Sequence, residues 1–213
     1  MAKKTGEKYR NIIEAAITVI AQHGYHNSQV SKIAKEAGVA DGTIYLYFQN
    51  KEDLLISLFR VKMNEFTTII RRDLKDKSQS AMEKLARLIT MHFSRLEADR
   101  NLALVLQIQL RQSDPAIRAG ITPPLKEYFN VIENIVKEGM ESGEFRTDLN
   151  IRVARQMIFG TMDEAATSWV LSQREYQISK HTETVYHLLA QALGKEGRYA
   201  PFPANIKLPE TKL

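Results

Sequence analysis

A short stretch of the sequence, residues 28–51, carries side chains that suit contact with nucleic acid. Thr43, Tyr45 and Tyr47 lie close together in GTIYLYF, and Lys51 follows four residues after the last of them. Hydroxyl and ammonium groups donate hydrogen bonds to phosphate oxygens, and such bonds fix the position of a protein on a duplex. These residue types therefore indicate binding to a polyanion and not a chemical reaction.

Two short helices are expected to position these side chains, one over 29–37 and one over 41–48. Gly38 lies between them and can adopt positive φ without steric cost. Two helices joined by such a turn form a helix-turn-helix, whose second helix meets base edges with its N-terminal residues. Ala40 and Gly42 are small, so the backbone there can approach a groove. The apolar residues expected to hold the two helices in place are Val30, Ile33, Ala34, Ala37, Val39, Ile44 and Phe48. The same corner also occurs in all-α proteins that bind no DNA, so spacing alone leaves both interpretations open.

Composition permits this function and argues against several others. The 213 residues have a formal net charge of +5, which allows a polyanionic partner without demanding one. Cysteine is absent, which excludes disulfides and thiolate chemistry and is typical of a reducing compartment. The N-terminus lacks the apolar core of a signal peptide, and no apolar run is long enough to span a membrane. We therefore expect a cytoplasmic protein.

Known patterns of catalysis and metal binding are missing from the sequence. No G-x-S-x-G, P-loop or dinucleotide-binding glycine pattern occurs. Asp163 and Glu164 are neighbours on an expected helix, so they point to different sides and cannot face one substrate as a pair. None of the histidines has a zinc-binding spacing with a carboxylate; they are His23, His26, His92, His181 and His187. We predict no enzyme, no metal and no cofactor.

Helical periodicity continues along the whole chain, so the fold class is all-α with about nine helices. Ser28, Asn50, Ser80 and Asp148 are the expected N-caps, and Ser80 forms a capping box with Glu83. The remaining helices are expected at 8–23, 50–75, 80–98, 101–112, 124–141, 148–171 and 179–193, with Gly24 ending the first and Pro123-Pro124 interrupting the chain. We assign 1–51 to a helix-turn-helix domain, 52–194 to a ligand-binding and dimerisation domain, and 195–213 to a flexible tail.

The C-terminal part carries more large apolar side chains than a plain core requires. Ordinary packing explains any one of them, but phenylalanines and methionines gathered in this way also line adaptable apolar pockets. Arginines before and after the helix at 101–112 suit an anionic group at the mouth of such a pocket. The candidate ligand residues are Phe59, Met63, Phe66, Phe93, Leu102, Leu106, Gln109, Arg111, Tyr128, Phe129, Met157 and Gly160.

Two apolar stripes near the C-terminus predict a homodimer. One stripe lies on the helix at 148–171 and the other on the helix at 179–193, and two copies of each would make a four-helix interface. Packing within one chain would also explain these stripes. The expected interface residues are Met162, Ala166, Trp169, Val185, Leu188 and Leu189.

Residues 9–59 resemble the N-terminal domain of the TetR family of repressors. The likeness rests on Gly24-Tyr25, on V-x-x-I-A-x-x-A-G-V at 30–39, on G-T-I-Y-x-Y-F at 42–48 and on N-K-E-D-L-L at 50–55. It implies a homodimer that binds a palindromic operator in double-stranded DNA, one half-site per subunit. The family usually has a serine where this chain has Ala40, and Asp41 can supply part of the missing cap.

The resemblance also implies residues for DNA contact and a class of effector. The implied DNA contacts are Gln29, Ser31, Lys32, Gly42, Thr43, Tyr45, Tyr47 and Lys51. Over residues 9–193 the chain is similar to members of the family that respond to long-chain acyl-CoA and repress fatty-acid degradation in Gram-positive bacteria. Two alternatives stay open: a different lipophilic effector acting on another regulon, or a DNA-binding protein that acts through a protein partner.

Overall fold

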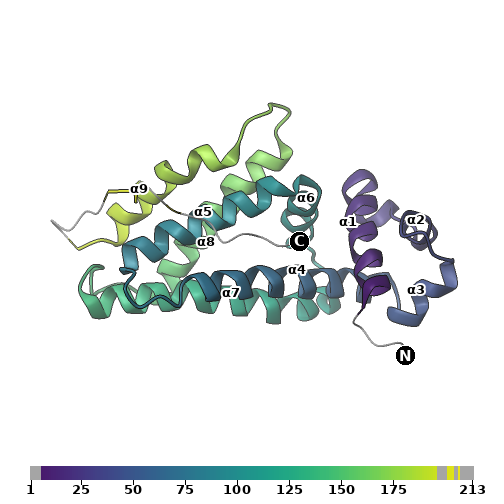
Figure 1. Ribbon diagram of the computed structural model, residues 1–213, viewed down its shortest axis with the longest axis horizontal. Helices are drawn as coiled ribbons and strands as arrows, with labels where there is room; N and C mark the ends of the chain where they lie inside the picture. Colours follow the sequence, from purple (N-terminus) through teal and green to yellow (C-terminus); the bar gives the residue numbers. More distant parts are fainter. Residues whose placement is uncertain (1–5, 196–200, 204–205, 207–213) are drawn as a thin grey trace. The chain divides into compact units, whose positions relative to one another are not determined.

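The computed structural model describes residues 6–195, 201–203 and 206, and in them the chain is all-α, as the sequence predicts. These residues form nine α-helices, one short 3-10 helix and no β-strand (Figure 1). The elements are α1 (Glu7–Asn27), α2 (Val30–Glu36), α3 (Asp41–Tyr47), α4 (Lys51–Asp73), α5 (Ala81–Ala98), α6 (Arg100–Gln109), α7 (Pro115–Ser142), α8 (Ile151–Leu171), η1 (Ile178–His181) and α9 (Thr182–Leu193). Of the expected flexible tail, only residues 195, 201–203 and 206 are among the described residues, and the rest lies outside them.

The helices group into two compact units. Unit 1 comprises residues 1–64 and 99–125, and unit 2 comprises residues 65–98 and 126–213. Unit 1 therefore joins α1, α2 and α3 to the first part of α4, to α6 and to the start of α7. Unit 2 contains α5, α8 and α9 with the remainders of α4 and α7. Both α4 and α7 contribute to both units.

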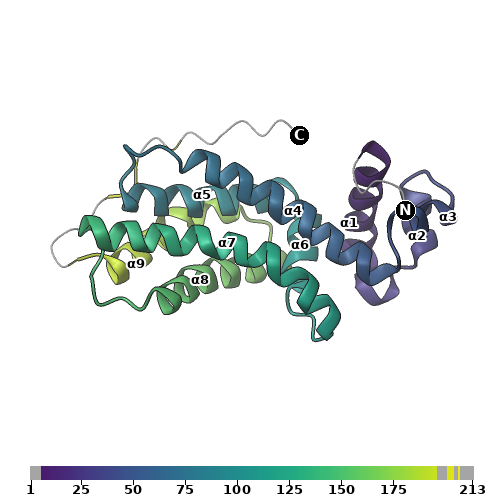
Figure 2. The ribbon, with the colours of Figure 1, turned by 90° about the horizontal axis from the view of Figure 1, so that it is seen from below.

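The core of unit 1 surrounds α1, which lies against α2 in both ribbon views (Figures 1 and 2). Ile12 and Ile13 of α1 are completely buried, as is Ile33 of α2. Helix α6 also packs on α1, and its Leu102 and Val105 enter the same core. In the middle of α1, Glu14 forms an ion pair with Lys62 of α4. The two short helices of the corner are thus held by a much larger body of apolar side chains.

The regular part of α1 ends at Gly24, as predicted, because Gly24 has a non-helical backbone with a φ of 73°. A short helical stretch follows this kink and extends α1 to Asn27. The hydroxyl of Ser28 donates to the carbonyl oxygens of Gly24 and Val19, at 2.7 and 3.2 Å. Ser28 is completely buried, so its hydroxyl needs these partners, and Gln29 takes the N-cap position of α2 in its place.

The expected interruption at Pro123-Pro124 is wrong, because both prolines lie inside α7. A proline inside a helix removes one backbone hydrogen bond and crowds the preceding turn. Here the apolar face continues across the prolines, with Ile121 before them and Tyr128 after them both buried. Burial of such side chains contributes about 1.5–3 kcal/mol each, which is enough to offset a disrupted turn.

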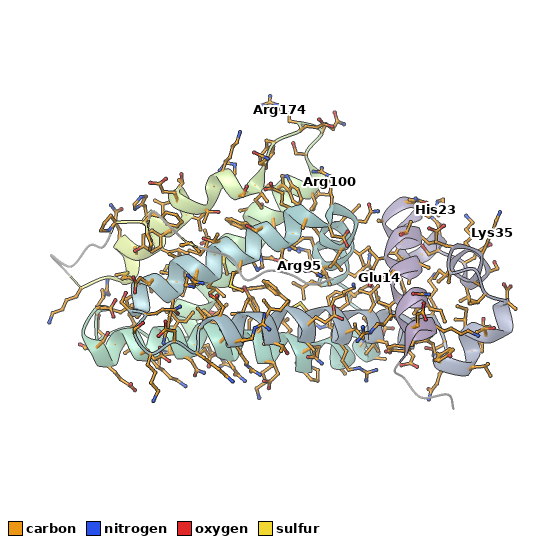
Figure 3. All side chains as sticks on the ribbon, viewed as in Figure 1. Glu14, His23, Lys35, Arg95, Arg100 and Arg174 are labelled. Atoms are coloured by element: carbon orange, nitrogen blue, oxygen red, sulfur yellow. The ribbon has the colours of Figure 1, made fainter. Side chains whose placement is uncertain are left out.

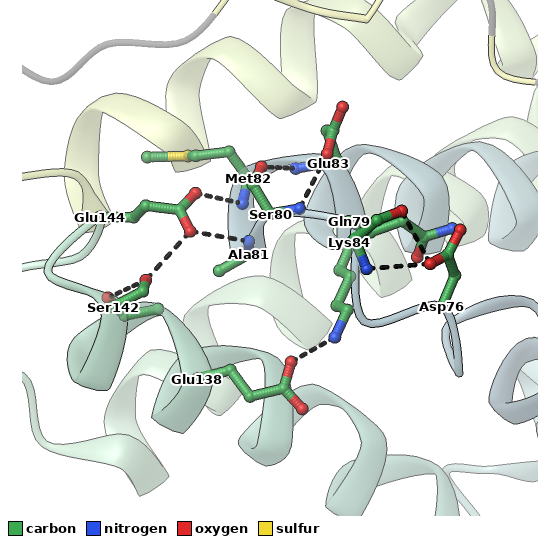
Figure 4. Close-up of polar contacts among 12 residues, drawn as sticks. Asp76, Gln79, Ser80, Ala81, Met82, Glu83, Lys84, Glu138, Ser142 and Glu144 are labelled. Carbon is green, nitrogen blue, oxygen red and sulfur yellow. Dashed lines mark hydrogen bonds and ion pairs between the residues drawn. The ribbon is translucent and has the colours of Figure 1, made fainter.

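Of the other three predicted N-caps, Asn50 and Ser80 are confirmed and Asp148 is replaced. The side-chain oxygen of Asn50 accepts from the backbone N–H of Asp53 at 2.7 Å at the start of α4. Ser80 and Glu83 form the reciprocal capping box of α5, at 2.8 and 3.1 Å (Figure 4). Helix α8 is capped by Asn150, not by Asp148. Asp148 instead forms a bidentate ion pair with Arg146 at 2.9 Å, which occupies its carboxylate.

A carboxylate holds the end of α7 to the start of α5 within unit 2 (Figure 4). Glu144 accepts hydrogen bonds from the backbone N–H groups of Ala81 and Met82, at 3.0 and 3.1 Å, and from the hydroxyl of Ser142 at 3.0 Å. Partial burial acts to raise the pKa of Glu144, but these donors outweigh it and the pKa is lowered. The first turn of a helix favours negative charge, so Glu144 stabilises the start of α5.

Replacing Glu144 by glutamine is expected to lower the free energy of unfolding at neutral pH by about 1–2 kcal/mol, because charge-assisted hydrogen bonds are lost. The folded-state pKa lies below the ordinary value of 4.5, so the carboxylate stabilises the fold above about pH 4.5. This contribution disappears as the pH falls through the folded-state pKa. Urea unfolding at several pH values measures it. Glu141→Gln, an exposed change on α7, is the control, and an equal effect in both variants would contradict the assignment.

Candidate functional site

The outward surface of α2 and α3 offers polar and aromatic side chains to solvent. Tyr45 and Leu46 on α3 are 56% and 58% exposed, whereas Ile44 between Thr43 and Tyr45 is buried. On the neighbouring helix Lys35 extends away from the protein (Figure 3). Among the predicted DNA contacts, Gln29, Ser31, Lys32 and Gly42 are exposed, and Thr43 and Tyr47 are half-buried. The structure therefore brings these residues to one two-helix corner.

The turn between these helices has the expected geometry. Gly38 has a φ of 66°, and the N–H of Val39 donates to the carbonyl oxygen of Ala34 at 2.9 Å. A side chain at Gly42 would meet nothing within 4 Å, so packing inside the unit does not require glycine there. Ala40 is the N-cap of α3 and provides no side-chain hydrogen bond, while Asp41 lies in the first turn.

Aromatic packing fixes the end of α3. The rings of Tyr9 on α1 and Phe48 are stacked with their centroids 5.1 Å apart, and Tyr47 lies 6.2 Å from Tyr9. Tyr9 and Phe48 are buried, whereas Tyr47 keeps part of its surface exposed. The orientation of Tyr47 is thus set by the core, which makes its partly exposed ring a rigid element of the surface.

Lys51 is more tightly held than an exposed phosphate contact would be. Its ammonium group donates to the carbonyl oxygen of His26 at 3.0 Å and lies 4.6 Å from the centre of the Tyr25 ring. Burial lowers the pKa of Lys51, against the opposite influence of Glu52. An ammonium group has three N–H donors, so two remain for other partners. Lys51 therefore joins α4 to the end of α1 while still presenting positive charge.

Unit 2 contains a cluster of aromatic rings contributed by four helices, which we call the aromatic cluster. Its members are Phe66 on α4, His92 on α5, Tyr128 and Phe129 on α7, and Phe159 on α8. Ring centroids of contacting pairs lie 4.9–6.2 Å apart. Three of the predicted ligand residues, Phe66, Tyr128 and Phe129, thus come together, and Phe93 lies beside His92.

The sequence analysis missed the polar centre of this cluster. The Nδ1 atom of His92 lies 2.9 Å from the hydroxyl oxygen of Tyr128, and the two rings are stacked. Burial lowers the pKa of His92 to about 4 and raises that of Tyr128, so both are neutral at pH 7. A usable signal was present, because His92 follows Leu88 and Ile89 at helical spacing on the buried side of α5.

An ion pair lies against the same cluster. The guanidinium of Arg155 on α8 is 4.3 Å from the centre of the Phe129 ring, and its Nε lies 3.3 Å from a carboxylate oxygen of Glu133 on α7. Arg155 is mostly buried, so the cation–π contact and the ion pair are both shielded from water. The positive charge of Arg155 is therefore balanced within unit 2.

The other predicted ligand residues are distributed differently. Phe59 and Leu102 are in the core of unit 1, and Met63 and Leu106 pack against that core. These four residues therefore do not join Phe66 in the aromatic cluster, because their apolar surface is buried in unit 1. The remaining four are Gln109, Arg111, Met157 and Gly160. The side-chain oxygen of Gln109 accepts a hydrogen bond from Gln112 at 2.5 Å, and the guanidinium of Arg111 donates to the backbone carbonyl of Gln107 at 2.6 Å. Met157 is half-buried and Gly160 is exposed.

Most of the predicted dimer residues are also placed differently. Met162 is 0% exposed, and Ala166, Trp169, Val185 and Leu189 are likewise buried inside unit 2. They pack in their own subunit, so they do not form a free surface. Leu188 is the exception at 60% exposure. Helix α8 presents a second apolar residue, Val153, to solvent and exposes Gly160, around which there is open space.

Two further structural tests concern membranes and metals. In the described part of the chain, no helix is long and apolar enough to cross a membrane. The same residues contain no group of three or more histidine, aspartate or glutamate side chains placed to hold a metal ion.

Comparison with known proteins agrees with this arrangement. Residues 12–58 match the family model "Bacterial regulatory proteins, tetR family", and residues 59–192 match "YsiA-like protein, C-terminal region". The chain is 52% identical over 191 residues to the fatty acid metabolism regulator protein of Bacillus subtilis, which covers 90% of this chain and 98% of that protein.

Two solved structures are similar over almost their full length. One is the transcriptional regulator FadR from Bacillus subtilis in complex with stearoyl-CoA, with 52% identity, a TM-score of 0.83 and coverage of 87% of this chain and 99% of that one. The other is the fatty acid degradation regulator FadR from Bacillus halodurans, with 50% identity, the same TM-score and the same coverage.

The buried His92 is expected to make the fold sensitive to mild acid. Its folded-state pKa of about 4 lies below the ordinary value of 6.5, so the unfolded chain binds the proton first as the pH falls. The free energy of unfolding should drop by about 2 kcal/mol from pH 7.5 to pH 5, as measured by urea titration. His92→Phe should lack this part of the decrease, whereas His23→Phe, at an exposed position on α1, should keep it. An unchanged pH profile in His92→Phe would contradict the burial of a neutral imidazole.

Proposed function

The chain belongs to the TetR family of bacterial regulatory proteins, and from that premise we propose that it is a dimeric repressor of fatty-acid degradation genes. Long-chain acyl-CoA is the proposed effector that releases it from its operator. The relative with 52% identity is a fatty acid metabolism regulator, and its solved counterpart is bound to stearoyl-CoA. We propose no catalytic activity and place the protein in the cytoplasm, where the chromosome is.

The observation that carries the DNA-binding part is the exposed corner formed by α2 and α3. Helix α3 is proposed to enter a major groove, with Gly42 and Thr43 nearest the bases because they lie at its N-terminal end. Gln29, Ser31, Lys32, Tyr45, Tyr47 and Lys51 are the proposed contacts to the sugar–phosphate backbone and groove edges. The open space around Gly42 leaves room for a groove wall.

A palindromic operator requires two copies of this corner, about one helical turn of DNA apart. The exposed apolar residues of α8 and α9 support a two-fold interface in unit 2, because Val153 and Leu188 would otherwise stay in contact with water. Gly160 would let the paired helices approach closely. This set replaces the buried residues that the sequence suggested.

The aromatic cluster is the proposed site for the acyl chain. Its rings come from α4, α5, α7 and α8, so a long apolar ligand inserted among them would separate these helices in unit 2. Because α4 and α7 continue into unit 1, such a change acts directly on helices that also support the DNA-binding corner. In unit 2, the exposed Arg152 and the half-buried Arg95 are candidates for binding the CoA phosphates.

A gel-shift experiment on the protein's own promoter region tests this proposal. The duplex should be bound at nanomolar protein and released by stearoyl-CoA, but not by stearate or CoA added separately, since only the thioester joins both recognition elements. A scrambled duplex is the control for sequence preference. Indifference of the complex to all three compounds would remove the effector assignment, and equal binding of the scrambled duplex would remove specific repression.

A further inference from the structure

The aromatic cluster contains one polar atom whose hydrogen-bonding capacity is unused. Within the described residues, Nε2 of His92 has no hydrogen-bond partner, although Nδ1 is engaged by Tyr128. His92 is only 6% exposed. The rings of Phe66, Phe93 and Tyr128 surround the imidazole, with centroids 5.8–5.9 Å from its own.

An unused polar atom at this depth needs an explanation. Buried side-chain nitrogens almost always have a partner, because leaving water without one is costly. The rings supplied by α4, α5 and α7 cannot provide a strong partner for Nε2, since the one hydroxyl among them is already engaged with Nδ1. The missing partner must therefore come from outside the chain.

We propose that His92 and Tyr128 recognise the thioester carbonyl of the acyl-CoA, with Nε2–H of His92 donating to the carbonyl oxygen. This inference rests on the proposed function and specifies which chemical group of the ligand, the thioester carbonyl, the aromatic cluster recognises. In this arrangement the Tyr128 hydroxyl donates to Nδ1, which leaves the proton of the neutral imidazole on Nε2. A carbonyl oxygen only accepts hydrogen bonds, so it matches the Nε2–H group.

The electrostatics of the cluster favour an uncharged carbonyl over a carboxylate. His92 is neutral at physiological pH because burial opposes its protonation. The cation packed on the cluster, Arg155, already faces Glu133. A fatty-acid carboxylate would lose its hydration here without gaining a nearby positive charge that is not already paired. A thioester is uncharged, and its carbonyl oxygen would accept a hydrogen bond from Nε2–H of His92. The pair would thus select the activated form of the fatty acid.

The test compares stearoyl-CoA with S-octadecyl-CoA, a thioether that lacks only the carbonyl oxygen. Binding of each to the full-length protein is measured by calorimetry. The wild type should bind the thioester at least about tenfold more tightly, because the thioether leaves Nε2–H without a partner. His92→Phe should bind the two ligands with equal affinity. Phe159→Leu, which shortens an apolar wall of the cluster, should weaken both ligands by the same factor and keep the preference.

The outcomes separate this inference from the proposed function. Equal binding of both ligands by the wild type, as expected if a water molecule serves Nε2, would overturn the inference alone. A preference that survives in His92→Phe would do the same. Binding of neither ligand by the wild type would overturn the proposed effector and this inference together. Should His92→Phe fail to fold, Tyr128→Phe keeps the ring and should reduce the preference, because the hydroxyl that holds the proton on Nε2 is gone.

Discussion

The structure depends on the fact that the two helices of the DNA-binding corner cannot be stable by themselves. Helices α2 and α3 have seven residues each, well below the length at which an isolated helix forms in water. They persist because Ile33, Ile44 and Phe48 are buried in the core of unit 1, beside α1 and α6. Burying one face of such short helices leaves the opposite face to solvent. The side chains proposed to meet DNA stand on that exposed face.

In unit 2, the hydrogen bonds of buried polar groups matter as much as apolar packing. Its helices are longer than α2 and α3, and their buried polar side chains, such as His92, need hydrogen-bond partners. Glu144 and the Ser80–Glu83 box satisfy the backbone donors at the start of α5. In the aromatic cluster, by contrast, His92 keeps one nitrogen without a partner. An unpartnered imidazole nitrogen among aromatic rings is a feature that a bound ligand can complete.

The sequence predicted what local rules control. Helical periodicity predicted the all-α class, and side-chain chemistry correctly predicted the caps at Asn50 and Ser80. Local rules failed where tertiary packing outweighed them. Helix α7 continues through Pro123 and Pro124 because apolar side chains on either side of the prolines, Ile121 and Tyr128, are buried.

The candidate sites divide in the same way. The helix-turn-helix corner could be predicted because its signals, Gly38 at the turn and apolar residues at helical spacing on each side, lie close together within residues 28–51. Five of the six predicted dimer residues, including Met162 and Leu189, are buried inside the subunit, because α8 and α9 have apolar residues on more than one face; Leu188 alone of the six is exposed. The pairing of His92 with Tyr128 joins residues 36 positions apart, so no local pattern could show it.

The claim that the exposed face of α2 and α3 contacts the DNA backbone is tested most directly by the salt dependence of binding to the promoter duplex. Each lysine that neutralises a phosphate contributes about one unit to the slope of log affinity against log salt concentration. Replacing Lys32 by glutamine should reduce this slope by about one for each contacting subunit. The same change at the exposed Lys126 of unit 2 should leave the slope unaltered. A slope that is unchanged by Lys32→Gln, or reduced as much by Lys126→Gln, would contradict the account.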